Sequence, residues 1–270
     1  MSAQTAIEWT NTTWNPILGC SILSPGCHHC YAMAMATRLK GVAEGKVARG
    51  EDPGRFLHYR DVIDQGRWNG RMILLPEALE DPLRWKRPQM IFVNSMSDLF
   101  HEHLEVEAIR QVCQVMRRAD HHTYQVLTKR AARMRELLCG ELAEFAGLPQ
   151  IWWGTSVENR RHGLPRIDEL RHIPAAVRFL SVEPLLEDLG QVDLTCIDWV
   201  IVGGESGTRS RPLHPDWVRS LRDQCATQGV KFFFKQWGGR NKKASGRELD
   251  GRTHDEIPQL LSLGLPTQKR

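Results

Sequence analysis

Three cysteines near the start of the sequence have the types and spacing of a metal-binding loop. Cys20, Cys27 and Cys30 follow the pattern C-x6-C-x2-C, and Gly19 and Gly26 suit the tight turns of such a loop. Iron–sulfur clusters are held by cysteine thiolates, so three cysteines would leave one iron of a [4Fe–4S] cube without a protein ligand. An open iron can bind a substrate or cofactor, as the open position of a catalytic zinc site does. The spacing therefore predicts a [4Fe–4S] cluster.

Zinc is the main alternative for the same loop. A tetrahedral zinc site needs four ligands, which the three cysteines and either His28 or His29 could supply. The chain has seven cysteines, an odd number in 270 residues, which argues against a secreted disulfide scaffold. The four cysteines outside the loop are interpreted as small buried hydrophobic residues: Cys113, Cys139, Cys196 and Cys225.

Short apolar runs along the chain predict the elements that position this loop. They occur at residues 17–19, 72–75, 90–94, 123–127, 151–154, 177–180, 199–202 and 231–234. Continuous hydrophobicity is typical of parallel strands buried on both faces, and most of these runs alternate with helical patterns. We therefore predict an α/β fold, a (β/α)8 barrel of the TIM type that is either closed or partial. The run at 72–75 is the weakest of the eight.

The segments between the runs predict one domain. Apolar residues recur at helical spacing over residues 106–119, 131–145 and 215–228. Residues 41–70 are rich in Gly, Arg, Asp and Glu without a clear period, and are interpreted as an insertion after the first helix. We expect a single barrel domain over residues 1–240 and a loosely packed C-terminal tail over residues 241–270.

The composition narrows the class of protein further. The sequence is 41% hydrophobic and 25% charged, and it lacks a run of 18 apolar residues that could cross a membrane. The N-terminal residues lack the basic start and apolar run of a secretory signal, so we expect a cytoplasmic protein without a membrane partner. The net charge of +4 allows an anionic partner but does not require one.

Polar residues follow the predicted strands at the point where each strand ends. Because the carboxyl ends of barrel strands meet at one mouth, where active sites lie, we expect these groups to converge with the cysteine loop. For any one of them, a turn or a helix cap is the structural alternative. The candidates are Asn94, Ser95, Asp98, Lys129, Thr155, Ser156, Glu158, Ser181, Glu183, Gly203, Gly204 and Glu205.

The loop resembles that of radical S-adenosylmethionine enzymes, whose usual motif is C-x3-C-x2-C after the first strand of a full or partial α/β barrel. The residues Asn15-Pro16, Gly19-Cys20, Gly26-Cys27 and Cys30-Tyr31-Ala32 resemble the subgroup of spore photoproduct lyase-like proteins. From Glu8 to Gly238 the chain is similar to a family of phages and mobile elements with a three-Cys motif. The six-residue first gap departs from the usual motif.

The resemblance implies a cofactor and contacts to it. It implies that S-adenosylmethionine binds the open iron and is cleaved reductively to a 5′-deoxyadenosyl radical, with an electron donor as partner. It assigns the amino group of the cofactor to Asn94, Ser95 and Asp98, and the carboxylate to Lys129. The ribose contact maps to Ser156 and Glu158, next to the further candidate Thr155, and His29 replaces the aromatic residue that usually contacts adenine. Ser181, Glu183, Gly203, Gly204 and Glu205 complete the expected cofactor site.

The substrate is less well specified by the sequence. The resemblance favours a nucleotide or nucleic acid, and basic residues such as Arg117, Arg118 and Arg135 either hold phosphates or form a solvated helix face. Two other functions stay open. One is a zinc-stabilised module that binds nucleic acid, and the other is a non-catalytic, cluster-binding barrel that acts with a partner protein.

Overall fold

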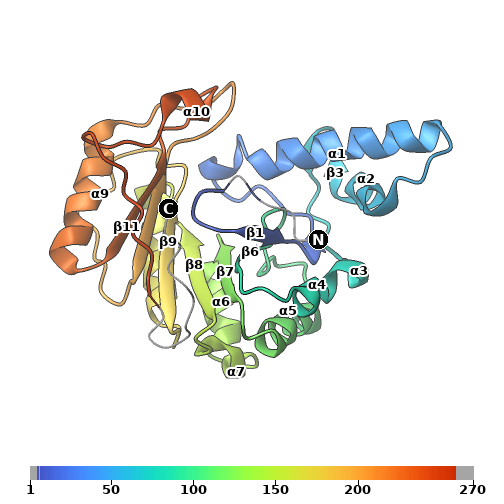
Figure 1. Ribbon diagram of the computed structural model, residues 1–270, viewed down its shortest axis with the longest axis horizontal. Helices are drawn as coiled ribbons and strands as arrows, with labels where there is room; N and C mark the ends of the chain where they lie inside the picture. Colours follow the sequence, from blue (N-terminus) through green and yellow to red (C-terminus); the bar gives the residue numbers. More distant parts are fainter. Residues whose placement is uncertain (1–4, 6, 260–270) are drawn as a thin grey trace.

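A parallel sheet of seven strands forms the centre of the protein (Figure 1). The computed structural model describes residue 5 and residues 7–259. The strands lie in the order β1 (Thr12–Trp14), β6 (Met90–Val93), β7 (Thr123–Thr128), β8 (Ile151–Ser156), β9 (Val177–Val182), β10 (Trp199–Gly203) and β11 (Lys231–Gln236). Neighbours are parallel and their order follows the chain, which gives an open part of a barrel. The predicted α/β fold is confirmed, in its partial form.

Helices cover one face of the sheet and connect most successive strands. They are α5 (Val106–Arg118), α6 (Ala131–Leu138), α7 (Ala143–Ala146), α8 (Arg160–Arg171) and α9 (Pro215–Gln228). The helices predicted over residues 106–119 and 215–228 are found nearly at those bounds. The one predicted over residues 131–145 is divided, because the N–H groups of Gly140 and Leu142 both donate to the carbonyl of Leu137 and so close the first helix.

Two of the predicted strands lie outside the barrel sheet. β2 (Ile17–Leu18) pairs antiparallel with β5 (Ile73–Leu74), whereas the first barrel strand is β1, upstream of Pro16. Proline lacks an N–H group and restricts the residue before it, so the extended segment is interrupted at Pro16. The sheet therefore has seven strands instead of eight, and the loop with Cys20 follows β2 rather than a barrel strand.

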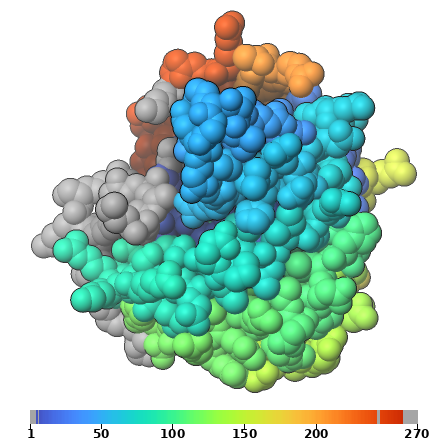
Figure 2. Space-filling view, turned by 90° about the vertical axis from the view of Figure 1, so that its right-hand side faces the viewer, coloured from blue at the N-terminus to red at the C-terminus, as the bar shows by residue number. Residues whose placement is uncertain are grey.

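Residues 31–70 form an arm that extends from the cysteine loop along one side of the sheet (Figure 1). The arm consists of α1 (Tyr31–Ala48), the short helices η2 (Gly54–His58) and α2 (Tyr59–Val62), and a hairpin of β3 (Ile63–Asp64) and β4 (Arg67–Trp68). α1 buries only Ala32, Ala36 and Ala43, so the sequence carries little apolar period there. Below the arm lie α3 (Pro76–Leu79) and α4 (Asp81–Arg84), drawn in teal in Figure 2.

The two faces of the sheet bury different side chains. The helix-covered face packs aliphatic residues, together with Trp14 and Trp153, against α5, α8 and α9. The opposite, concave face packs a cluster of aromatic rings: Trp9, Phe92, Trp152, Phe179, Trp199 and Phe233. A side chain at Gly154 would come within 2.5 Å of the Phe179 ring, so glycine is required there. Because these rings fill the concave face, a functional site is expected at the carboxyl end of the strands.

The chain returns to the last strand before the described residues end. Phe234 donates its N–H to the carbonyl of His254 at 2.9 Å, and the indole N–H of Trp199 donates to the carbonyl of Glu256 at 2.7 Å. These contacts cover the β11 edge of the sheet, and residues 260–270 of the predicted tail lie outside the described residues. No helix among the described residues is long and apolar enough to cross a membrane.

Candidate functional site

The cysteine loop, residues 20–30, lies at the carboxyl end of the sheet, between β2 and α1. Cys20, Cys27 and Cys30 are all half-buried. A short 3-10 turn, η1 (Pro25–Cys27), places Cys27, whose N–H donates to the Ser24 carbonyl at 2.9 Å. Cys30 stands directly before α1, and its N–H donates to the Cys27 carbonyl at 3.3 Å. Backbone turns thus fix the spacing of the cysteines.

The thiols share one electrostatic environment. Burial raises the pKa of Cys20 to about 12, and the Asp98 carboxylate and, to a smaller extent, Cys30 and Cys27 contribute in the same direction. Burial also raises the pKa of Cys30, and the Lys129 ammonium opposes that shift. Among the described residues, no three His, Cys, Asp or Glu side chains are already close enough to hold a metal ion. The donor chemistry, three thiols on one loop, fits an iron–sulfur cluster, whose positive metal ions would stabilise the thiolates.

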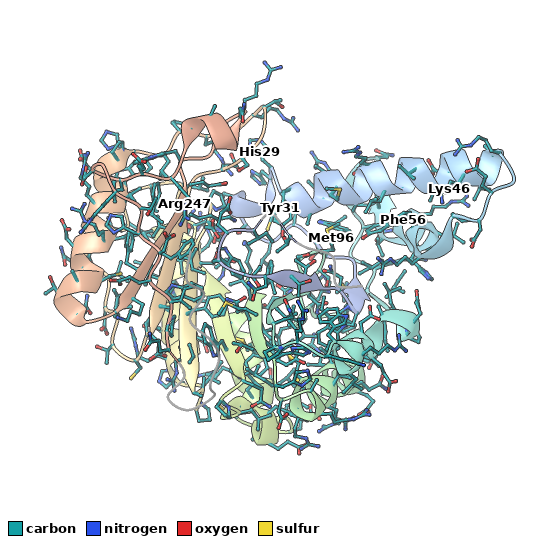
Figure 3. All side chains as sticks on the ribbon, viewed as in Figure 1. His29, Tyr31, Lys46, Phe56, Met96 and Arg247 are labelled. Atoms are coloured by element: carbon teal, nitrogen blue, oxygen red, sulfur yellow. The ribbon has the colours of Figure 1, made fainter. Side chains whose placement is uncertain are left out.

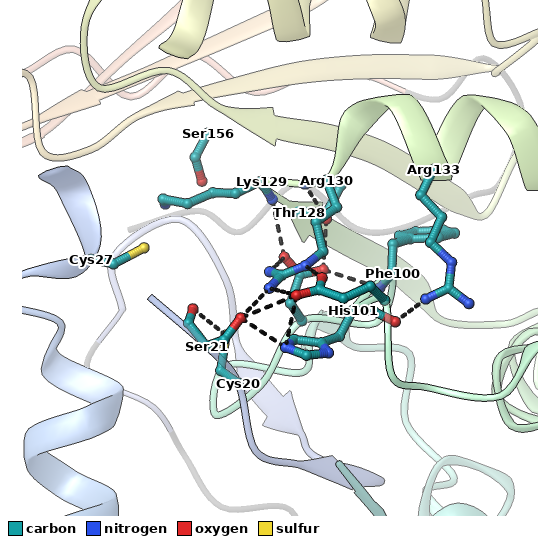
Figure 4. A network of polar contacts seen from close by, with 12 residues as sticks. Cys20, Ser21, Cys27, Phe100, His101, Thr128, Lys129, Arg130, Arg133 and Ser156 are labelled. Carbon is teal, nitrogen blue, oxygen red and sulfur yellow. Dashed lines mark hydrogen bonds and ion pairs between the residues drawn. The ribbon is translucent and has the colours of Figure 1, made fainter. Parts of the chain in front are cut away.

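A buried ion-pair network anchors the Cys20 end of the loop to the loops after β6 and β7 (Figure 4). Arg130 donates to the Ser21 hydroxyl at 2.7 Å and to the Asp98 carboxylate at 3.0 Å, and it also pairs with Glu102. Asp98 further accepts from the Thr128 hydroxyl at 2.6 Å. The Arg130 and Asp98 side chains are 7% and 8% exposed. Because both charges are buried and hydrogen-bonded, the network holds Ser21, and with it Cys20, in one position.

His101 completes this network as a neutral ring. Its Nδ1 atom accepts the N–H of His103 at 3.1 Å, so the proton is on Nε2, which donates to the Ser21 hydroxyl at 2.9 Å. Burial, with a further contribution from Arg130, lowers the pKa of His101 to about 4. The ring therefore does not act as a base toward Ser21. It orients that hydroxyl beside Cys20.

A second ion-pair group anchors the other end of the loop. His29 Nδ1 lies 2.9 Å from the buried carboxylate of Glu205, which follows β10. Arg211 pairs with the same carboxylate and also donates to the Pro25 carbonyl at 3.0 Å. Burial raises the pKa of Glu205, but hydrogen bonds from Arg211 and His29 outweigh it and lower the pKa to about 2. The predicted candidates His29 and Glu205 thus contact each other.

Glu158, after β8, forms a buried pair behind the middle of the loop. Its carboxylate accepts from Arg166 at 2.7 Å, and both residues are buried. A side-chain atom on Gly26 would come within 3.2 Å of Glu158, so the loop lies directly against this carboxylate. Burial raises the pKa of Glu158, but Lys129 and Arg166 outweigh it, and the net shift is downward. Figure 4 shows the Lys129 side chain extending away from the Arg130 network, on the side of Cys27 and Ser156.

Five further candidates lie in β8, β9 and β10 or directly after them. Glu183 pairs with Lys235 at 3.0 Å and accepts from the Ser181 hydroxyl at 3.2 Å. A side chain on Gly203 would come within 2.6 Å of Glu183, and one on Gly204 within 2.0 Å of the Trp237 carbonyl. Close packing against the backbone therefore requires glycine at position 204, whereas the contact at position 203 is with the end of the flexible Glu183 side chain. Thr155 differs, because its buried hydroxyl donates to the Thr128 carbonyl at 3.0 Å within the sheet.

Asn94 and Ser95, after β6, contact residues of β1, β2 and the start of α1. Asn94 is buried with a φ of 60°, and its side-chain oxygen accepts the Ile17 N–H at 3.3 Å. Its Nδ2 group is buried without a hydrogen-bond partner among the described residues. Ser95 donates its hydroxyl to Asn15 Oδ1 at 3.1 Å, and its carbonyl accepts from the Tyr31 hydroxyl at 3.1 Å.

Comparison with protein families gives a match over residues 4–258 to the family described as protein of unknown function, DUF5131. The chain belongs to the DUF5131 family. Curated proteins give no match to it. Among solved structures, it is similar to a mutant spore photoproduct lyase with bound AdoMet and dinucleoside spore photoproduct. The identity is 11%, the TM-score is 0.42, and the alignment covers 83% of this chain and 63% of that one.

Several residues that hold the cysteine loop of this DUF5131 protein are not recognisable from the sequence. Arg130, Arg166 and Arg211 each hold a carboxylate beside the cysteine loop, yet the sequence offers them only as ordinary basic residues. Ser21 and His101 also belong to no motif that would identify them from the sequence. The one available signal is that Arg130 directly follows the candidate Lys129 at a strand end, where a barrel places its functional groups.

Proposed function

We propose that this chain is a radical S-adenosylmethionine enzyme with a [4Fe–4S] cluster on Cys20, Cys27 and Cys30. The observation that carries the proposal is the position of three half-buried thiols on one loop at the carboxyl end of a parallel partial barrel. Barrel enzymes assemble their active sites at that end, and three thiolates leave one iron open. When bound, such a cluster supplies the electron that cleaves S-adenosylmethionine into methionine and a 5′-deoxyadenosyl radical.

The predicted site residues divide into two roles under this proposal. Asp98 and Glu205 hold the loop, because their carboxylates already accept hydrogen bonds from Arg130 and Arg211. Lys129 and Asn94 are the better candidates for cofactor contacts. The Lys129 charge acts on both Cys30 and Glu158, and the buried Nδ2 group of Asn94 has no partner among the described residues. An unpaired buried donor is costly unless a ligand accepts from it.

A nucleotide or nucleic-acid substrate remains part of the proposal, as does the similarity to phage proteins with a three-Cys motif. The basic residues on the outer helices add little support for it. Arg117, Arg118 and Arg135 each pair with a glutamate, at 2.5, 3.6 and 2.8 Å. They are therefore best interpreted as a solvated helix face. An electron donor is the further partner that reductive cleavage requires.

Anaerobic reconstitution tests the proposal. The protein should take up about four iron and four sulfide per chain, the content of the cube, and should release 5′-deoxyadenosine after addition of dithionite and S-adenosylmethionine. Cys27→Ala should lose the cluster, whereas Cys139→Ala, at an exposed cysteine outside the loop, should retain it. Full cluster content in Cys27→Ala would show the ligand assignment to be wrong.

The same experiment separates the two other functions. Stoichiometric zinc, no brown colour and salt-dependent binding of nucleic acid would support the zinc module. A complete cluster that never yields 5′-deoxyadenosine, with any candidate substrate, would support a non-catalytic barrel that acts with a partner protein.

A further inference from the structure

A cavity of about 280 Å³ opens beside β1, at the edge of the sheet opposite β11. It lies between the arm and the α3–α4 segment, on the side of the molecule that Figure 2 faces. Thr13, Trp14 and Asn15 form the part contributed by β1 and the residue after it. The volume is near the lower limit for ligand pockets, so it suits a single small ring system rather than a large cofactor.

Aromatic side chains line the cavity from two elements. Phe56 and Tyr59 come from the arm, and Trp85 comes from the end of α4. Figure 3 shows Phe56 on the side of α1 that faces β1. Trp85 is held in place, because its carbonyl accepts from His121 at 2.8 Å and its ring meets His122 edge-on at 5.9 Å. Aromatic side chains such as these stack favourably on a planar ring of a ligand.

Asn15 supplies a directed polar group in the lining. Its Oδ1 atom accepts the Met96 N–H at 3.0 Å and the Ser95 hydroxyl at 3.1 Å. Since a backbone N–H can only donate, these bonds fix which side of the amide is oxygen. The Nδ2 group therefore carries two donors that have no acceptor among the described residues. A ligand in the cavity with a ring nitrogen or carbonyl can accept from it.

Charged residues stand at the rim. Arg55 is exposed, and Asp81 is half-buried, with its carboxylate 3.4 Å from Arg84. A cation beside the aromatic wall suits a phosphate, and a carboxylate suits an exocyclic amino group. A ligand that combines a planar ring, a hydrogen-bond acceptor on that ring and a phosphate group is a nucleotide.

We propose that this cavity binds the base of a nucleotide, between Phe56 and Trp85, with Asn15 Nδ2 donating to the ring. Leu18 and Met96 line the cavity and belong to the apolar cluster that Cys20 and Cys30 pack against. The bound base and the cysteines would thus pack against the same apolar cluster. The role of this base as substrate rests on the proposed radical function, but its binding does not.

Calorimetric titration of the full chain, before cluster reconstitution, tests the site. Adenosine and thymidine 5′-monophosphates should bind, and ribose 5-phosphate, which lacks a base, should bind at least tenfold more weakly. Phe56→Ala should weaken nucleotide binding about tenfold through lost stacking. Asn15→Asp keeps the acceptor for Ser95 and Met96 but loses both donors, and should cost about tenfold as well. Leu57→Ala, at an exposed neighbour outside the lining, should bind like wild type.

Three results would overturn the inference. They are no binding of either nucleotide at millimolar concentration, wild-type affinity in both Phe56→Ala and Asn15→Asp, and ribose 5-phosphate binding as tightly as the nucleotides. Thermal melting of each variant separates loss of binding from loss of folding. Because no cluster is present in this assay, its failure leaves the 5′-deoxyadenosine result unaffected. Conversely, if the protein binds nucleotides but never forms 5′-deoxyadenosine, the result would support the nucleotide site and contradict the radical mechanism.

Discussion

Both ends of the cysteine loop are anchored by ion pairs with a buried carboxylate, but the two ion-pair groups differ in how deeply they are buried. At the Cys20 end, the side chains of Arg130 and Asp98 are 7% and 8% exposed. At the Cys30 end, Glu205 is 4% exposed, but its partners His29 and Arg211 are 28% and 31% exposed. Both partners of the first ion pair are therefore shielded from water, whereas in the second anchor His29 and Arg211 remain accessible to it.

The degree of burial determines how much free energy is needed to break each anchor. Breaking an ion pair whose partners are both buried leaves a charge without water or counter-charge, whereas an exposed cation is resolvated when its partner leaves. We therefore expect the Cys20 end to be a fixed reference point. We expect the end with Cys27 and Cys30 to separate from Glu205 more readily, which would suit the entry of a cluster and its cofactor.

Arg130→Met should have the largest effect. It leaves Asp98 buried without its cation, and losing one partner of a buried pair costs about 3–5 kcal/mol. The measurement is the free energy of unfolding of the full chain in urea. Arg133→Met is the matched control, since Arg133, in the first turn of the helix that Arg130 precedes, donates to the carbonyls of His101 and Leu104 rather than to a carboxylate. Equal losses in the two variants would contradict the importance of the buried charge.

Acid should weaken the same anchor before it weakens the other. Burial lowers the pKa of His101 from 6.5 to about 4, so between these values the unfolded chain binds a proton that the folded chain does not. Its contribution to stability is complete above pH 6.5 and falls as the pH decreases to 4, by at most about 3 kcal/mol. In His101→Gln, which has no group titrating in this range, the unfolding free energy should depend less steeply on pH. An unchanged slope would show that His101 is charged in the folded protein.

The sequence predicted the barrel elements better than the anchors, for a physical reason. Strands such as β7 and β10 are buried on both faces, so burial alone makes their residues apolar and recognisable. β1 has only three residues, ends just before Asn15-Pro16 and was missed. α1 was recognised only in part, because alanines form its buried stripe.

The candidate site shows the same limit. Asp98, Glu158 and Glu205 were predicted from their places after strands, since topology brings strand ends together. Their arginine partners could not be predicted, because Arg130, Arg166 and Arg211 reach their carboxylates through long side chains whose direction depends on tertiary packing. The cofactor roles assigned to these carboxylates remain predictions.

Glu205→Gln should cost less than Arg130→Met. The change keeps the shape but removes the charge that His29 and Arg211 share, and with partly exposed partners we expect a loss of about 1.5 kcal/mol in unfolding free energy. The pKa of Glu205 is lowered from 4.5 to about 2, so its contribution is complete above pH 4.5 and is lost as the pH falls toward 2. After reconstitution, the variant should also release iron to a chelator faster than wild type. A larger loss of stability than in Arg130→Met would reverse the order of the two anchors.

Arg117→Gln should have the smallest effect on stability of the substitutions compared here. Arg117 pairs with Glu144 at 2.5 Å on the outer helices, with side chains 44% and 50% exposed, and it also lies 5.0 Å from the centre of the Phe145 ring. Exposed pairs contribute little because water and salt screen them, so the unfolding free energy should fall by less than about 1 kcal/mol. Affinity for nucleotides should not change, because Arg117 is outside the cavity at β1. If the variant instead lost nucleotide binding, the phosphate-binding surface would lie on the outer helices, and the solvated-face interpretation of these arginines would be wrong.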